Sequence, residues 1–274
     1  MSLSSPLHII RRLLGGTFSR LATPLERSSY GAYSGVFNDF ESARASLPTN
    51  PGFDHEALAA EYVDIRTKKV FAYDYPVMWW LEHAFLGGAS SVLDIGGSVG
   101  VHYYAYRRYF DMPADLEWRV VEVPAMIAVG RSLAEKHGAT ALSFVEDLNR
   151  AVATIASDLW ISAGAVQYIE DGRPDSLLKR CVVRPRHVLL NKLPLYGGVD
   201  FVTTQNIGEG SFAPLHVYNR ARFIRDMRLL GYTLRDQWPV YERSLHLPGH
   251  PERSFPSFTG LYFVDSESSE PPSE

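Results

Sequence analysis

Between positions 91 and 100 the chain reads Ser-Val-Leu-Asp-Ile-Gly-Gly-Ser-Val-Gly. Apolar, β-favouring residues lead into an acid, Asp94, and then into a glycine-rich turn, which an apolar and aromatic stretch follows. This order predicts a strand, a tight loop and the first turn of a helix, an arrangement that presents backbone N–H groups to a nucleotide-like ligand. An ordinary strand-to-helix turn without a ligand is the alternative, because short motifs also occur by chance.

The spacing of the glycines separates two kinds of nucleotide-binding loop. The dinucleotide fingerprint needs glycine at the first, third and sixth places of a six-residue window. A window that starts at Gly96 has Ser98 and Val101 at the third and sixth places, so this fingerprint is absent. The pattern present is Asp-x-Gly-x-x-x-Gly, formed by Asp94, Gly96 and Gly100.

A second acid follows the glycine loop at the distance that a nucleotide-binding unit requires. Glu122 ends the strand-like run 118–121, and such an acid, about 20 residues beyond the loop, can accept hydrogen bonds from the two ribose hydroxyls. Pro124 comes next, where the first turn of a helix tolerates proline. Alone, Glu122 reads as a solvated charge at a strand end, but beside the glycine loop it favours ribose binding.

These segments resemble a family of S-adenosylmethionine-dependent methyltransferases that is common among bacterial polysaccharide-biosynthesis genes. The resemblance rests on residues 93–100, 120–124 and 161–170, with 202–206 and 223–232 in the expected order, and it covers roughly residues 30–240. It implies a class I, Rossmann-like methyltransferase with S-adenosyl-L-methionine as cofactor and a small-molecule or glycan-linked acceptor, and we expect a hydroxyl as the site of methylation. The glycine loop and Glu122-x-Pro124 also resemble small-molecule O-methyltransferases. Those enzymes carry a histidine base just after the fourth strand, whereas this chain reads Leu-Trp-Ile-Ser-Ala-Gly-Ala-Val-Gln-Tyr at 159–168.

The resemblance assigns one group of residues to the cofactor. In such loops the glycines let the backbone approach the methionine part, and the acid orients the loop or its ligand. A carboxylate after the strand-like run 141–145 could accept a hydrogen bond from the adenine amino group, and we choose Asp147. The alternative is that Glu146 or Asp147 only caps the next helix. The residues assigned to cofactor binding are Asp94, Gly96, Gly97, Ser98, Gly100, Glu122, Val123, Asp147 and Ser162.

The catalytic candidates are side chains that could remove a proton from the acceptor. Methyl transfer needs an in-line approach of the nucleophile, which is held about 3 Å from the methyl group, and a base when the nucleophile is a hydroxyl. His216 is our first choice, because the pKa of histidine lies near working pH. His102, just after the glycine loop, is the second choice and Tyr168 the third, while a structural role is the alternative for either histidine. No set of His, Cys, Asp and Glu has the spacing of metal ligands, so no metal is expected.

The acceptor is expected over the carboxyl ends of the strands. The stretch 193–218 is too polar and glycine-rich for a core and is expected to wrap the acceptor through Gln205 and Asn206. Gln167 follows the fourth strand, while Tyr33 and Tyr75 stand in loops and are candidates for a lid.

The hydrophobic pattern predicts an α/β fold: a mainly parallel, seven-stranded Rossmann-like sheet with an antiparallel last strand and an N-terminal helical layer. We expect strands at 91–95, 119–123, 141–145, 158–163, 186–191, 232–240 and 257–264, and helices at 99–110, 125–137, 147–156, 174–182 and 219–230. The expected organisation is an amphipathic or loose segment (1–29), a helical cap or lid (30–88) with a helix from Phe53 to Val70, the S-adenosylmethionine-binding domain (89–264) and a disordered acidic tail (265–274).

Composition narrows the classes of partner. A net charge of −4 gives no general attraction to nucleic acid. The single cysteine, Cys181, excludes an internal disulfide, fits the cytoplasm and is predicted in a buried helix. No segment has the roughly 18 apolar residues of a membrane span. The N-terminal segment could pack on its own domain, on a second subunit of a homodimer or, peripherally, on a membrane surface.

Two further functions stay open from the sequence. One is an NAD-dependent oxidoreductase on a similar sheet, against which Ser98 and Val101 argue. The other is a non-catalytic member that binds the cofactor or a partner without transferring a methyl group.

Overall fold

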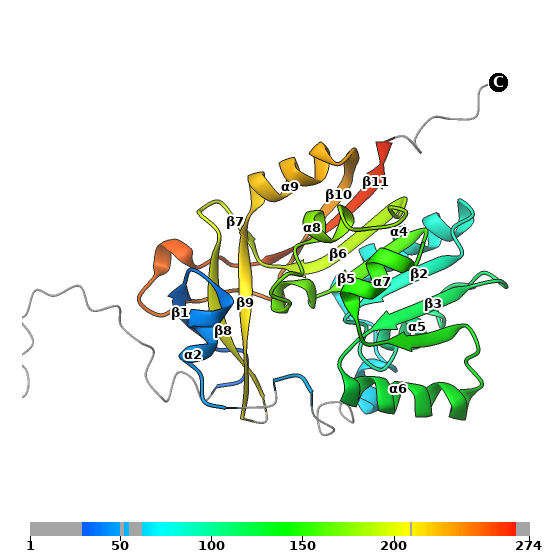
Figure 1. Cartoon of the computed structure of the whole chain (residues 1–274), viewed down its shortest axis with the longest axis horizontal. Helices are drawn as coiled ribbons and strands as arrows, with labels where there is room; N and C mark the ends of the chain where they lie inside the picture. The colour runs from blue at the N-terminus through cyan, green and yellow to red at the C-terminus, as the bar shows by residue number, and fades with distance from the viewer. Residues whose placement is uncertain (1–28, 50–51, 55–61, 209, 267–274) are drawn as a thin grey trace, which may run out of the picture.

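The computed structural model describes residues 29–49, 52–54, 62–208 and 210–266. Its centre is a seven-stranded sheet with the order β10-β11-β6-β5-β2-β3-β4 (Figure 1). Only β11 runs antiparallel to its neighbours in this sheet, and the other pairs are parallel. This is the Rossmann-like order of class I methyltransferases with the last strand reversed, so the predicted fold is confirmed. The strands are β2 (Ser91–Ile95), β3 (Glu117–Val121), β4 (Leu142–Val145), β5 (Leu159–Ala163), β6 (His187–Leu193), β10 (Tyr232–Val240) and β11 (Phe258–Asp265).

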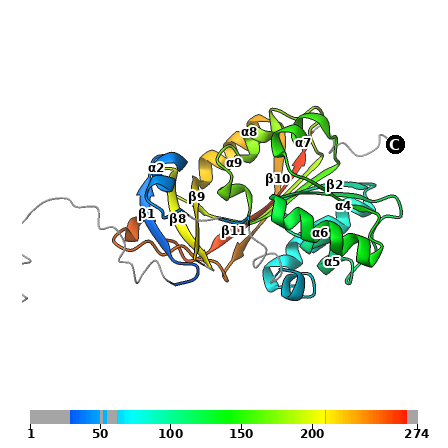
Figure 2. The same cartoon turned by 60° about the horizontal axis from the view of Figure 1, so that its bottom comes forward.

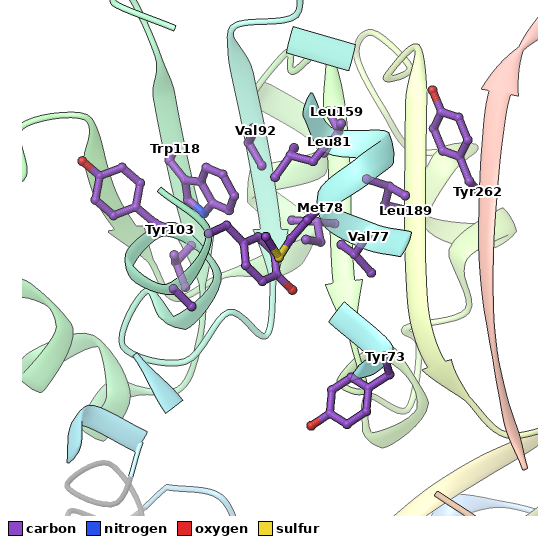
Figure 3. Packing of buried hydrophobic residues seen from close by; sticks show 14 of the residues in the cluster. Tyr73, Val77, Met78, Leu81, Val92, Tyr103, Trp118, Leu159, Leu189 and Tyr262 are labelled. Carbon is purple, nitrogen blue, oxygen red and sulfur yellow. The ribbon is translucent and has the colours of Figure 1, made fainter. Parts of the chain in front are cut away.

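Side chains along a buried strand point alternately to the two faces of the sheet, so the core consists of one cluster on each face. Val92 packs in one cluster with residues of α4 (Tyr75–Leu86), α5 (Val101–Tyr106) and α6 (Pro124–His137) (Figure 3). Its neighbour Leu93 packs in the other, with residues of α7 (Leu148–Thr154), α8 (Pro174–Leu178) and α9 (Arg220–Leu229). Burying each such aliphatic side chain stabilises the fold by about 1.5–3 kcal/mol. Both faces are therefore covered, as a parallel sheet requires.

Local signals explain where the helices around this sheet begin and end. Helix α6 begins at Pro124 and ends before Gly138, which has a left-handed φ of 59°. At the start of α9 the Asn219 side chain accepts a hydrogen bond from Arg222 N at 2.7 Å. Helix α8 stops at Leu178, so Cys181 is half-buried beyond the helix and not within a buried helix as predicted.

The stretch 193–218, which was expected to wrap the acceptor, contributes three strands to a second sheet. Its strands β7 (Leu195–Tyr196), β8 (Phe201–Gly208) and β9 (Ser211–Asn219) join β1 (Tyr33–Phe37) in the order β1-β8-β9-β7. Polar side chains are buried here because β1 satisfies them: the Thr203 hydroxyl donates to Gly35 O and that of Thr204 to Ser34 O, both at 2.8 Å. The prediction that this stretch is too polar to be buried is wrong for that reason.

The segment 30–88 is helical only in part. It contains strand β1, helix α2 (Phe40–Ala45), a π-helical turn η3 (Tyr62–Arg66), a short 3-10 turn η4 (Ala72–Asp74) and α4. The helix predicted from Phe53 to Val70 lies partly outside the described residues, and its described part holds only η3. Residues 1–28 and most of the predicted acidic tail also lie outside them. Among the described residues, no helix is long and apolar enough to cross a membrane.

Candidate active site

A cavity of about 550 Å³ opens at the carboxyl ends of the parallel strands. Its walls include the last residues of β2, β3 and β5, Lys192 near the end of β6, and residues of β1 and β8 from the second sheet. Figure 2 shows β1, β8 and β9 to one side of the seven-stranded sheet. The cavity is thus where an open α/β sheet binds its ligands, and two further short elements, η3 and η5 (Val166–Tyr168), contribute to its wall.

The glycine loop after β2 forms one wall of this cavity through Gly96, Gly97 and Ser98. Gly96 has a φ of +74°, and a Cβ there would lie 2.0 Å from Cβ of Ala165. Ser98 adopts a φ of 55°, which is uncommon for a residue with a side chain. Such backbone conformations concentrate at binding sites.

Glu122, at the end of β3, faces the same cavity and holds the loop. Its Oε1 accepts a hydrogen bond from Ser98 N at 3.1 Å, and its Oε2 accepts one from Val123 N at 2.8 Å. Desolvation is the main cause that raises the pKa of Glu122 to about 7, while the two backbone hydrogen bonds act in the opposite direction. A carboxylate in this position can accept further hydrogen bonds from hydroxyl groups in the cavity. Val123, which was also assigned to the cofactor, lines the cavity.

Asp94 does not line the cavity. Its carboxylate lies behind the glycine loop, where it contacts residues of the loop and of the elements beside it. It is fully buried, and its Oδ2 accepts hydrogen bonds from His102 Nδ1 at 2.9 Å and from Trp118 Nε1 at 3.1 Å. A Cβ at Gly97 would meet this carboxylate at 2.3 Å. Of the two roles expected for the acid, the structure supports orientation of the loop.

Three other residues assigned to the cofactor do not line the cavity, and each has another role. Gly100 begins α5 with a φ of 93°, and a Cβ there would meet Leu142. Asp147 caps α7 by accepting from Arg150 N at 2.9 Å, and its neighbour Glu146 lines the cavity instead. The Ser162 hydroxyl donates to Ile95 O at 2.9 Å and ties β5 to β2. These three side chains or positions therefore act within the fold and do not face the cavity.

Four of the five residues assigned to the acceptor line the cavity, namely Tyr33, Gln167, Gln205 and Asn206. Gln205 donates from Nε2 to the Tyr33 hydroxyl at 3.1 Å and accepts at Oε1 from the Tyr168 hydroxyl. Desolvation raises the pKa of Tyr33 to about 12 and that of Tyr168 well above its usual value, so both phenols are neutral near pH 7. Tyr168 is therefore a hydrogen-bond donor and not a base.

Two amide side chains complete this part of the wall. Gln167 and Asn206 line the cavity, and Gln167 Oε1 is buried without a hydrogen-bond partner among the described residues. Tyr75 does not line it: the side chain is 55% exposed and packs edge-on against Tyr109. The expectation that Tyr75 forms a lid is not supported, because this tyrosine starts α4 and faces solvent.

The structure separates the two histidines proposed as bases. His102 lines the cavity, with Nδ1 held by Asp94. His216 is on β9, packs against Phe40 and Tyr218, and is bonded through Nε2 to Glu170 O at 3.0 Å. It does not line the cavity, so the structure removes our first choice of base from the candidate site.

Three cationic residues in the cavity wall were not predicted from the sequence: Arg66 on η3, Lys192 near the end of β6, and Arg243 after β10. Lys192 is 9% exposed and has a φ of 58°. With Ser98, it is one of the two non-glycine residues with positive φ in the described part of the chain, and both line the cavity. One signal was available, because Asn191 and Lys192 place polar side chains directly at the end of an apolar strand. Nothing in the sequence brings Arg66 or Arg243 to the same place.

Comparisons with known proteins give only distant similarities. No protein-family model matches the chain, and no curated protein matches it. Among solved structures, the 1,6-didemethyltoxoflavin-N1-methyltransferase of Burkholderia thailandensis is 16% identical, with a TM-score of 0.49 over 81% of this chain and 93% of that chain. An S-adenosylmethionine-dependent methyltransferase of Clostridium acetobutylicum is 10% identical (TM-score 0.49; 76% and 97%), and the [4+2]-cyclase SpnF is 14% identical (TM-score 0.45; 69% and 80%). Similarity at this level does not identify a reaction.

Proposed function

We propose that this protein is an S-adenosyl-L-methionine-dependent methyltransferase that acts on a small-molecule or glycan-linked acceptor, at a hydroxyl oxygen. The observation that carries the proposal is the pairing of the loop at Gly96–Ser98 with Glu122 at the carboxyl edge of the sheet, within one cavity. The glycan-linked class of acceptor rests on the family resemblance of the sequence.

The residues present fit this cofactor. Glu122 would accept hydrogen bonds from the ribose hydroxyls, since its carboxylate faces the cavity beside the loop. Gly96, Gly97 and Ser98 would lie against the methionine part, because these positions bring backbone to the cavity wall. Glu146 replaces Asp147 as the acid for the adenine end. When bound, the cofactor supplies a methyl group activated on a positively charged sulfur.

His102 is the residue that we assign to proton removal. Asp94 accepts the hydrogen bond from Nδ1, which favours the tautomer with a free lone pair on Nε2. In the proposed reaction the acceptor oxygen gains the methyl group and its proton goes to Nε2 of His102. Tyr168 and Gln205 would hold the acceptor by hydrogen bonds from neutral groups.

Calorimetric titration with S-adenosylhomocysteine tests the proposed cofactor. We expect the purified protein to bind it and Gly96→Val to abolish binding, because even a Cβ at this position meets Ala165 at 2.0 Å. Gly197→Val is the matched control, since a Cβ there meets nothing within 4 Å and Gly197 does not line the cavity. A folded wild-type protein without detectable binding would refute the proposal.

Methyl transfer itself needs a separate measurement. Candidate acceptors are incubated with S-adenosylmethionine, and formation of S-adenosylhomocysteine is followed. S-adenosylhomocysteine that forms only in the presence of an acceptor supports the proposed methyl transfer. Binding without product for any acceptor would indicate a non-catalytic protein, and a thermal shift with NAD(H) but not with S-adenosylmethionine would indicate an oxidoreductase.

A further inference from the structure

Three cations lie in one part of the cavity wall. Nζ of Lys192 is 5.0 Å from the centroid of the Tyr73 ring, and the Arg66 guanidinium carbon is 4.5 Å from that of Phe71, which stacks on Tyr73. Arg66 and Arg243 both lower the pKa of Tyr73 and of Lys192, so the three charges are close enough to act on one another. They come from separate elements of the fold, and the cavity is what they share.

Among the described residues, none of the three forms an ion pair. The two carboxylates that act on Lys192 are already used. Asp94 accepts from His102 and Trp118, as described above. Asp74 accepts from Phe71 N at 2.9 Å and from the Tyr106 hydroxyl at 3.1 Å. The cations therefore lack a dedicated negative partner in the described part of the chain.

The surroundings of Arg243 are aromatic. The ionisable side chains that act on it are the tyrosines Tyr30, Tyr168, Tyr73 and Tyr33, and no carboxylate is among them. Burial keeps the phenols of Tyr33 and Tyr168 neutral, as described above, so they do not balance the guanidinium charge. Partly buried cations without a counter-charge are costly unless a ligand supplies one.

The cavity wall carries charges of both signs. Glu122 lines it beside the glycine loop, where Ser98 N and Val123 N donate to its two oxygens, and the three cations line it at other positions. A ligand that carries groups of both charges suits such a cavity.

We propose that Arg66, Lys192 and Arg243 bind an oxyanion, a carboxylate or a phosphate, on the methyl acceptor. The inference rests on the proposed function, because that function assigns the part of the cavity at the glycine loop and Glu122 to the cofactor. The cofactor does not supply the missing charge: its methionine end is zwitterionic and its sulfur is positive, so the bound cofactor adds net positive charge. Two guanidinium groups and an ammonium suit an oxyanion, which each guanidinium can contact through two parallel hydrogen bonds.

The test uses calorimetric titration of three probes into the protein saturated with S-adenosylhomocysteine. D-glucuronate carries a carboxylate, inorganic phosphate is the second oxyanion, and D-glucose is the neutral match to glucuronate. We expect glucuronate or phosphate to bind and glucose not to bind. The oxyanion that binds more tightly shows whether the site prefers a carboxylate or a phosphate on the acceptor. Equal binding of glucose and glucuronate, or no binding of either oxyanion, would overturn the inference.

Variants separate this site from the cofactor site. Arg243→Gln is expected to weaken oxyanion binding by about tenfold or more, which is the loss of one charge-assisted contact, and to leave the affinity for S-adenosylhomocysteine within about threefold. Lys192→Met is expected to behave in the same way, while Arg150→Gln, an exposed residue of α7 outside the cavity wall, is the control. If Arg243→Gln weakens S-adenosylhomocysteine as much as the oxyanion, the cations hold the cofactor carboxylate and the inference is wrong.

Titrations without S-adenosylhomocysteine distinguish the two proposals. If glucuronate or phosphate binds to a protein that does not bind S-adenosylhomocysteine, the oxyanion site stands and the proposed function fails. If S-adenosylhomocysteine binds and neither oxyanion does, the proposed function stands and this inference fails.

Discussion

The affinity for S-adenosylhomocysteine should depend on the protonation of Glu122. The pKa of this carboxyl is about 7 in the cavity, because desolvation opposes the charged form. About one tenth of the carboxyls are then ionised at pH 6 and about nine tenths at pH 8. Ribose hydroxyls donate hydrogen bonds, so they bind the ionised form. The apparent dissociation constant should therefore rise about tenfold as the pH falls from about 8 to 6, since only the ionised fraction is competent to bind.

The sign of this effect follows from linkage. A ligand that prefers the ionised carboxylate lowers its pKa and releases a proton on binding near pH 7. Calorimetry in two buffers that differ in ionisation enthalpy measures this release directly. Lys192, with a pKa lowered to about 7, titrates in the same range, mainly because of desolvation and the nearby Arg66 and Arg243. The test therefore compares the pH dependence of the dissociation constant in the wild type with that in a variant of Glu122.

Glu122→Gln is that variant. It keeps the shape of the side chain but removes the charge and one acceptor, so we expect S-adenosylhomocysteine to bind about tenfold to a hundredfold more weakly at pH 8, the range for a lost hydrogen bond to a charged group. The part of the pH dependence caused by Glu122 should vanish. Glu117→Gln, on the same strand with a 73% exposed side chain, is the control. Wild-type affinity that is flat between about pH 6 and 8, or a variant with the same pH profile, would refute the role of Glu122.

Three further predictions concern proton transfer and stability. His102→Gln should leave the affinity for S-adenosylhomocysteine within about threefold and lower turnover by about a hundredfold or more in an acceptor assay; unchanged turnover would exclude His102 as the base. Leu81→Ala removes a fully buried side chain between α4 and the sheet and should reduce the free energy of unfolding by about 2–5 kcal/mol in urea; a loss below about 1 kcal/mol would contradict the packing in Figure 3. Asn219→Ala removes the cap of α9 and the hydrogen bond that Nδ2 donates to Gly198 O, and should cost about 1–2 kcal/mol by the same measurement; a cost below about 0.5 kcal/mol would contradict the capping role.

The seven-stranded sheet was predictable because its signals are local. An apolar strand, the glycine turn after Ile95 and the capping residues Pro124, Asn219 and Gly231 each act over a few residues, and the structure has an element boundary at each of them. The second sheet was not predictable in this way. Strand β1 is held by Thr203 and Thr204, and no short-range pattern reveals that a polar strand will find its partner so far along the chain.

The same difference between local and long-range signals applies to the residues of the candidate site. Gly96, Ser98 and Glu122 line the cavity because strand ends of a parallel sheet meet at one edge, which the sequence pattern already implies. His216 lies outside the cavity, and the sequence could not show this because a histidine in a polar stretch gives no information about which face of a strand it occupies. Arg243 was missed because its approach to the cavity depends on the turn between β10 and β11, where Phe258 N donates to Arg243 O at 2.8 Å.

The pairing of β1 with β8 has a consequence for how the protein matures. Tyr33 and Gln205, which meet across this pair, are 172 residues apart in the sequence. During synthesis the chain emerges from its N-terminus, so β1 has no partner until the ribosome has translated β8. Contacts of such long range form late, because closing a large loop precedes any gain from them. The part of the cavity wall that β1 and β8 supply is thus completed only after the glycine loop and Glu122 have been made.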